Sequence, residues 1–175
     1  MNDTTRPVPA VSLRVPTEED ARAWHRVFDD PDVMEFHGGT ADLPSYEELV
    51  ARQRAHAAER GFCFWTMLDR GGAEGGEVIG FTGAQPWPHP TFGPVGEIEI
   101  GRRPARPYWG RGYVTAAARM TLERVRTAGI GSVVAMVDAR NARSVAVTRR
   151  LGMELERTFP LSAPEREAYC FRLHL

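Results

Sequence analysis

One segment of the chain, residues 97–129, passes from a strand through a glycine turn into a long helix. EIEIG (97–101) alternates apolar and polar residues, which is typical of a strand. After the turn RPYWGRG, apolar residues from Val114 to Ala128 recur at helical spacing until Gly129 ends the helix. A strand that continues directly into such a helix indicates an α/β domain.

The rest of the chain shows the same two periodicities. Six more strands are expected, at 11–15, 62–68, 77–84, 132–137, 153–159 and 167–173. Three more helices are expected, from Thr17 to Phe28, from a Ser45-Tyr-Glu-Glu48 capping box to Gly61, and over about 141–151. Glycines between the second and third strands predict a hairpin, and the proline-rich stretch 85–96 predicts a loop over a surface or cleft. The order predicts an α/β fold with a mixed, mostly antiparallel sheet and about four helices.

Length and charge exclude several classes of protein. The 175 residues are expected to form one domain, 1–175, with a loose start at 1–10. A formal net charge of −1 gives no overall positive field that would favour nucleic acid or an anionic membrane. No apolar run approaches membrane length, and Cys63 and Cys170 lack metal-ligand spacing. We therefore expect a soluble, cytoplasmic protein with no metal, no nucleic-acid partner and no membrane partner.

The glycine turn has the makings of an anion site. A Gly-x-Gly turn at a helix start leaves backbone N–H groups pointing at one spot, where the helix dipole adds positive charge. Arg106 and Arg111 flank it, so a diphosphate is the natural ligand. A P-loop is excluded because the chain has no lysine, and a dinucleotide fingerprint would need glycine or alanine at Thr115. The simpler alternative is a turn that only caps its helix.

Several stretches carry a family resemblance that covers nearly the whole chain. They are DDPDVMEF (29–36), PSYEELVARQ (44–53), EVIGFTG, GEIEIG with RPYWGRGYVTAA, and DARNARSVAVTRRLGME (138–154). The chain resembles the Gcn5-related N-acetyltransferases (GNAT), and within them the branch that includes the Rim-type ribosomal-protein N-terminal acetyltransferases. The most specific parts are Tyr-Trp-Gly-x-Gly-Tyr and Asn-x-x-Ser followed by Leu-Gly.

The resemblance implies that acetyl-CoA, as co-substrate, lies in a wedge where a seven-stranded sheet splays. Its pantetheine arm would pair with the backbone of Ile100, Gly101 and Arg102, and Asn141 would bond the same arm. The residues expected at the diphosphate are Arg106, Trp109, Gly110, Arg111, Gly112 and Tyr113.

Two positions depart from the family pattern. Pro107 stands where many members carry glutamine or arginine, and Arg106 is the nearest substitute. Thr148 stands where many relatives carry the tyrosine that protonates the leaving thiolate. In the Rim-type branch a serine three residues after the asparagine can take this role, and here that residue is Ser144.

Amine acetylation also needs a base, and two carboxylates are placed to supply it. Glu97 and Glu99 lie two apart on one strand and therefore share a face, which is either solvated or turned to the cleft. Paired carboxylates push one pKa upward. Glu99 is nearer the expected thioester, whereas the family's base often lies where Glu97 falls, so both remain candidates. A backbone N–H near Ile100 and Gly101 would stabilise the oxyanion.

The acceptor side is the least defined part of the sequence. In relatives the N-terminal helical region forms the acceptor pocket, which suggests Trp24, His25, Phe36 and His37. A tryptophan such as Trp24 is more often a core residue, and a histidine beside two glycines, as His37 is, more often belongs to a loop. The expected reaction moves an acetyl group to a primary amine, of a peptide N-terminus or a small molecule, by direct attack in a ternary complex. The alternative is a non-catalytic acyl-CoA-binding regulatory module. A homodimer is possible on either interpretation.

Overall fold

The computed structural model describes residues 8–72, 74–163 and 165–175, which contain a seven-stranded sheet of order β1-β2-β3-β4-β5-β7-β6. Neighbouring strands are antiparallel except β4 and β5, which are parallel. The strands are β1 (Val11–Arg14), β2 (Phe64–Asp69), β3 (Glu77–Pro86), β4 (Ile98–Pro104), β5 (Ser132–Asp138), β6 (Glu154–Pro160) and β7 (Glu167–His174). The predicted α/β fold with a mixed, mostly antiparallel sheet is confirmed.

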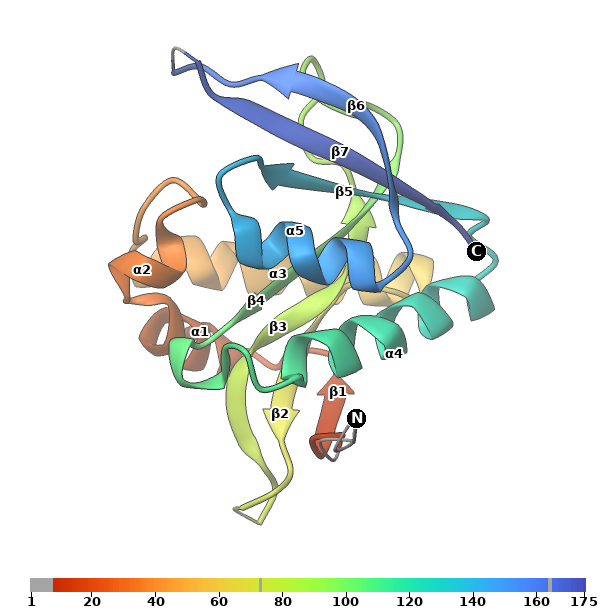
Figure 1. Cartoon of the computed structure of the whole chain (residues 1–175). Coiled ribbons are helices and arrows are strands. Elements are labelled where there is room, and N and C mark those ends of the chain that lie inside the picture. Colours follow the sequence, from red (N-terminus) through yellow and green to blue (C-terminus); the bar gives the residue numbers. More distant parts are fainter. Residues whose placement is uncertain (1–7, 73, 164) are drawn as a thin grey trace, which may run out of the picture.

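Helices cover both faces of this sheet, with α4 and α5 crossing in front of it and α3 behind it (Figure 1). Their bounds are α1 (Asp20–Phe28), α2 (Pro31–Met34), α3 (Leu43–Arg60), α4 (Tyr113–Thr127) and α5 (Ala142–Arg150), with a 3₁₀ turn η1 at Arg106–Tyr108. Successive side chains along each strand point alternately into two cores, one on each face, as expected for a sheet that is covered on both faces. One core stacks Phe64 on Phe81, with ring centroids 4.8 Å apart, and the other buries Ile100 and Val133 against α4.

Two helix starts differ from the sequence prediction. The helix α3 begins at Leu43 rather than at the Ser45 capping box, because the carboxylate of Asp42 accepts from the Ser45 N–H at 3.1 Å. A fifth helix, α2, was not expected. Asp30 caps it by accepting from the Asp32 N–H at 2.9 Å, with Pro31 in its first turn. The Asp-Pro pair ends one helix and also starts the next.

The N-terminal stretch was expected to be loose. Its residues 1–7 lie outside the described part of the chain, so that expectation is tested only for the last three residues. There the Ala10 carbonyl accepts from the Arg70 N–H at 2.8 Å, just before β1. The chain is thus fixed from Ala10 onward.

The sheet splays between its two parallel strands. β4 pairs with β3 along its whole length, but its only register pair with β5 is Glu99 with Val134. Among the described residues, the edge of β4 from Ile100 to Pro104 therefore has no strand partner on the β5 side. Backbone groups on such an edge need a partner from water or a ligand.

Candidate functional site

A cavity of about 580 Å³ lies at this splay. The turn before α4, one side of α5, the free edge of β4 and the segment after α2 all contribute to its walls. The residues that line the cavity include Phe36, His37, Arg102, Arg103, Trp109, Gly110, Arg111, Gly112, Asn141, Arg143 and Ser144. Most residues predicted for the cofactor are thus brought to one cavity.

The start of α4 presents backbone donors to the cavity. Gly110 and Gly112 have φ angles of 66° and 87°, in the left-handed region that favours glycine. Gly112 is the N-cap of α4 and provides no side-chain hydrogen bond to the first turn. The first N–H groups of a helix lack intrahelical acceptors, so this end of α4 is suited to an anion.

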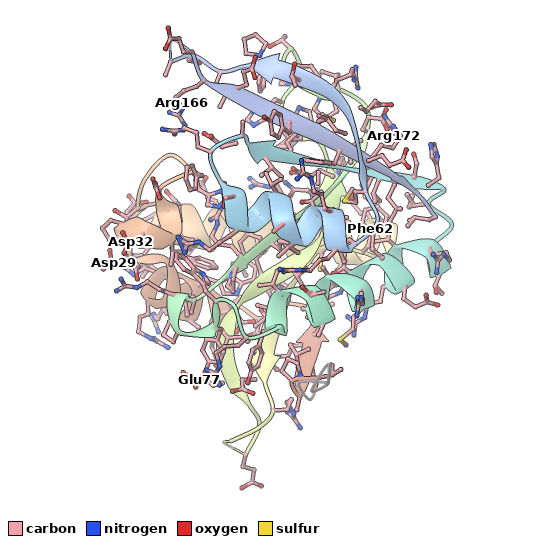
Figure 2. The ribbon with its side chains drawn as sticks, in the orientation of Figure 1. Asp29, Asp32, Phe62, Glu77, Arg166 and Arg172 are labelled. Carbon is pink, nitrogen blue, oxygen red and sulfur yellow. The ribbon has the colours of Figure 1, made fainter. Side chains whose placement is uncertain are left out.

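The arginines at this turn play different parts. Arg106 does not face the turn, because its guanidinium forms ion pairs with Asp30 at 3.0 Å and Asp32 at 2.8 Å, and Figure 2 shows Asp32 on α2. Its predicted role at the diphosphate would require those ion pairs to open. Arg111 lies over the rings of Tyr108 and Tyr113.

Cationic charge also reaches the cavity from α5, through Arg143. The Arg143 guanidinium lies 4.0 Å from the centre of the Trp109 ring, and both residues line the cavity. The Trp109 indole in turn donates to the Pro104 carbonyl at 3.2 Å. The Arg143 guanidinium therefore lies beside the turn that the sequence predicts to bind the diphosphate.

Helix α5 brings Asn141 and Ser144 to the opposite wall of the cavity. The Asn141 side chain caps the helix, because its Oδ1 accepts from the Ser144 N–H at 3.1 Å. The side chain of Arg102 reaches across from β4 and donates to the Ser144 carbonyl at 3.0 Å and to its Oγ at 3.3 Å. The pantetheine prediction for Arg102 concerned its backbone, and the contact of its side chain with Ser144 was not predicted.

The two candidate bases are in different environments. Glu99 accepts from Gln85 at 2.7 Å, and Gln85 accepts from Gln53 of α3 at 2.7 Å. Burial raises the pKa of Glu99 from the ordinary 4.5 to about 7, although the Gln85 hydrogen bond and the charge of Arg103 act against the rise. Glu99 is also the residue of β4 that forms the register pair with Val134 of β5, which places its backbone where the sheet begins to splay.

Glu97 is held away from such a role by an ion pair. Its carboxylate binds both terminal nitrogens of Arg172 on β7, at 2.8 and 3.1 Å. These hydrogen bonds lower the pKa of Glu97, and Glu156 shares the same guanidinium. A carboxylate with a low pKa is a weak base, so the structure favours Glu99.

The raised pKa of Glu99 predicts a pH-dependent stability. Between pH 4.5 and about 7 the folded chain holds a proton on Glu99 that the unfolded chain has lost. The contribution of this group to stability must therefore fall as pH rises through that window. Glu99→Gln should remove this trend. The free energy of unfolding of the variant, relative to that of the wild type, should therefore increase by up to about 3 kcal/mol from pH 4.5 to about 7. Urea unfolding at both pH values measures the difference, and a constant difference would contradict the assignment.

The four residues suggested for the acceptor pocket divide into two pairs. Phe36 and His37 line the cavity, whereas Trp24 and His25 do not. Trp24 is fully buried in the core against Phe81, and the His25 ring packs against Tyr46. Direct contact with an acceptor is therefore no longer expected for Trp24.

His37 lies close enough to Arg103 for the charge of the guanidinium to affect its pKa. His37 is exposed at the surface but surrounded by protein on its inner side, and this burial, followed by the charge of Arg103, lowers its pKa. Its imidazole is therefore neutral at pH 7. The Arg103 guanidinium lies 5.2 and 5.1 Å from the ring centres of Phe28 and Phe81.

Comparison with known proteins identifies the class. Residues 11–154 match the family model of the acetyltransferase (GNAT) domain, and the chain therefore belongs to the GNAT acetyltransferases. The protein YkkB of Bacillus subtilis (strain 168) is 29% identical over 166 residues, which cover 91% of this chain and 93% of YkkB.

Solved structures show the same fold. An acetyltransferase from Agrobacterium tumefaciens C58 aligns with a TM-score of 0.76 and 26% identity, over 100% of this chain and 96% of its own. RimJ of Mycobacterium smegmatis, in complex with CoA-disulfide, aligns with 0.75 and 22%, over 96% and 83%. YncA of Salmonella typhimurium, with acetyl-CoA, aligns with 0.72 and 17%, over 94% of both chains.

The described residues contain neither a helix that could span a membrane nor a cluster of metal-ligating side chains. No helix there is long and apolar enough to cross a membrane. No group of three or more histidine, cysteine, aspartate or glutamate side chains in the same residues is arranged to hold a metal ion.

Proposed function

We propose that this chain is an N-acetyltransferase that moves an acetyl group from acetyl-CoA to a primary amine by direct attack. One observation carries the proposal: Glu99, a carboxylate with a pKa raised to about 7, forms the register pair of β4 with β5 from which the sheet splays, three residues before the first β4 residue that lines the cavity, Arg102. A group that titrates near neutral pH is suited to remove a proton from an attacking amine. Family membership supports the reaction class.

The residues present fit acetyl-CoA. The open first turn of α4 after Gly112 suits the diphosphate, and Arg143 beside Trp109 adds positive charge. The unpaired edge of β4 from Ile100 to Pro104 offers N–H and C=O groups to the amides of the pantetheine arm. RimJ and YncA are described with CoA-disulfide and acetyl-CoA bound, which supports the same use here.

Each step then has a residue to perform it. Acetyl-CoA supplies the acetyl group as a thioester. Glu99, held by Gln85, accepts the proton of the amine directly or through water. A β4 N–H near Ile100 or Gly101 donates to the carbonyl oxygen as negative charge develops. Ser144, on the wall formed by α5, donates to the sulfur as the thiolate departs.

Replacing Ser144 should affect turnover and spare binding. Ser144→Ala removes a hydroxyl that interacts more strongly once charge reaches sulfur, so turnover should fall by roughly 10-fold or more while acetyl-CoA affinity changes little. Thiol release and calorimetry give the two values. Ser162→Ala, an exposed serine in the loop before β7, is the control. If Ser144→Ala keeps wild-type turnover, Ser144 does not assist thiolate departure and is only a surface residue.

The acceptor is a primary amine, and we propose a peptide N-terminus or a small molecule, with the Rim-type branch as the nearest model. Incubating a lysate with labelled acetyl-CoA, followed by mass spectrometry, identifies the acetylated products. A thiol-release assay over a panel of peptides, polyamines and aminoglycosides then compares candidates. The alternative is a regulatory module that binds acyl-CoA without turnover. Tight acetyl-CoA binding with no acetylated product in either assay would favour that alternative.

A further inference from the structure

The N–H, the carbonyl and the Oγ of Ser144 all form hydrogen bonds, and only the hydroxyl hydrogen is left without an acceptor among the described residues. Its N–H donates to Asn141 Oδ1, and its carbonyl accepts from Thr148 at 2.8 Å and from Arg102 at 3.0 Å. Its Oγ accepts from Arg102 at 3.3 Å. A guanidinium has no acceptor, so the hydroxyl hydrogen of Ser144 is not used on Arg102. Because Ser144 lines the cavity, this hydrogen is available to a group bound there.

Arg102 itself is a cation without a counter-charge. None of the ion pairs among residues 8–72, 74–163 and 165–175 includes it, and its Nε is buried without a hydrogen-bond partner. Its other contacts are the neutral oxygens of Ser144 and Thr148. Burial lowers the pKa of Arg102 to about 10, so the guanidinium remains charged at neutral pH.

A buried charge without a counter-ion is costly for the fold. The cost falls when an anion forms next to it, because the pair then attracts strongly in a poorly solvated site. Arg102 and Ser144 line the same cavity, at the wall where the mechanism places the departing sulfur. An uncompensated cation at this place thus favours the thiolate over the thioester.

We propose that Arg102 is a positioning residue for the leaving sulfur: it fixes the Ser144 hydroxyl as a donor toward sulfur and supplies the positive charge that stabilises the thiolate. The inference rests on the proposed function. The C–N bond forms, the C–S bond breaks, and its electron pair goes to sulfur. The amine proton goes to Glu99, and the thiolate takes a proton from water after release.

The test measures the thiol of bound CoA rather than turnover alone. Ultraviolet absorbance of the thiolate, titrated with pH in the protein–CoA complex, should give a thiol pKa below that of free CoA for the wild type. Arg102→Met keeps the apolar packing but removes the charge, so this pKa should rise by about one unit or more and turnover should fall by about 10²-fold. Arg102→Lys, which keeps the charge, should recover part of both.

Control variants separate this role from a structural one. Arg149→Met removes an exposed arginine of α5 that does not line the cavity, and it should change neither value. Thr148→Val removes one partner of Arg102 but leaves the contacts of Arg102 with Ser144. This variant should therefore lower Tm and leave the thiol pKa of bound CoA near its wild-type value.

Two outcomes overturn the proposal, and they can be told apart. A purely structural Arg102 would give Arg102→Met a lower Tm and an unchanged thiol pKa. If that variant does not fold, Arg102→Gln, neutral but still able to donate to Ser144, must show the pKa rise, and a wild-type value contradicts the charge effect. Failure of wild-type protein to bind CoA would remove the proposed function together with this inference.

Discussion

Gly112→Asp should abolish acetyl-CoA binding in a protein that remains folded. The carboxylate would stand at the open N-terminus of α4, where the diphosphate is proposed to bind, and would repel it. The side chain would also occupy the space that the ligand needs beside the backbone. Calorimetry should show affinity lower by at least roughly 10²-fold, which corresponds to about 2.7 kcal/mol.

Matched variants separate charge from backbone strain. Gly112→Asn has the same size and a similar tolerance of positive φ, so its smaller loss would isolate the effect of charge. Packing is not the obstacle, because a Cβ at Gly112 would lie 3.6 Å from the nearest atom of Pro9. Gly96→Asp, at φ 83° with open space around it, tests strain in a remote loop. Wild-type affinity in folded Gly112→Asp would contradict the assignment of this turn.

Glu99→Gln should give the largest loss of turnover. The amide keeps the shape of the side chain and a hydrogen bond with Gln85 but cannot accept a proton. Turnover should fall by roughly 10² or more and partly recover at high pH, where free amine is abundant. Wild-type turnover should rise with pH through about 7, because the pKa of Glu99 lies there and only the ionised form is a base. Steady-state rates across the pH range measure both effects.

Glu97→Gln is the internal control for this prediction. Glu97 is ionised well below neutral pH because Arg172 binds it, so its loss should leave the shape of the pH profile unchanged and turnover within a few-fold. Similar losses for the two variants would mean that the effect is structural. If both variants keep near-normal rates, the base is water or the neutral imidazole of His37.

The sheet and long helices were predictable because local periodicity reports which face is buried. The short helix α2 was harder to see, since Asp30-Pro31 is both a helix stop and a helix start. The start of α3 was misplaced because Ser45 satisfies a capping-box pattern, whereas Asp42 with Pro44 supplies the actual cap. Where two local signals compete, tertiary contacts decide between them.

The candidate site was predictable only where a motif fixes the backbone. The glycine turn, Asn141 and Ser144 all reached the cavity for that reason. The partners of side chains depend on contacts distant in sequence: Arg172 binds Glu97 from 75 residues away, and Arg102 binds Ser144 from 42. Gln53 and Gln85, which hold Glu99, carry no local pattern that could have indicated them.

The single register pair between β4 and β5 also determines how the molecule can open. The strands β1 to β4 form one continuously bonded set and β5, β7 and β6 another, and within the described part of the chain only the pair Glu99 and Val134 joins the two ladders. Sub-global unfolding tends to follow boundaries that few hydrogen bonds cross, so we expect the sheet to open first along this seam, although the core that holds Ile100 and Val133 spans it. A ligand lying along the seam couples the two ladders, and at a hundredfold excess over its Kd it adds about 2.7 kcal/mol to the folded state. We therefore expect a ligand in the cleft to slow amide hydrogen exchange on both sides of the seam.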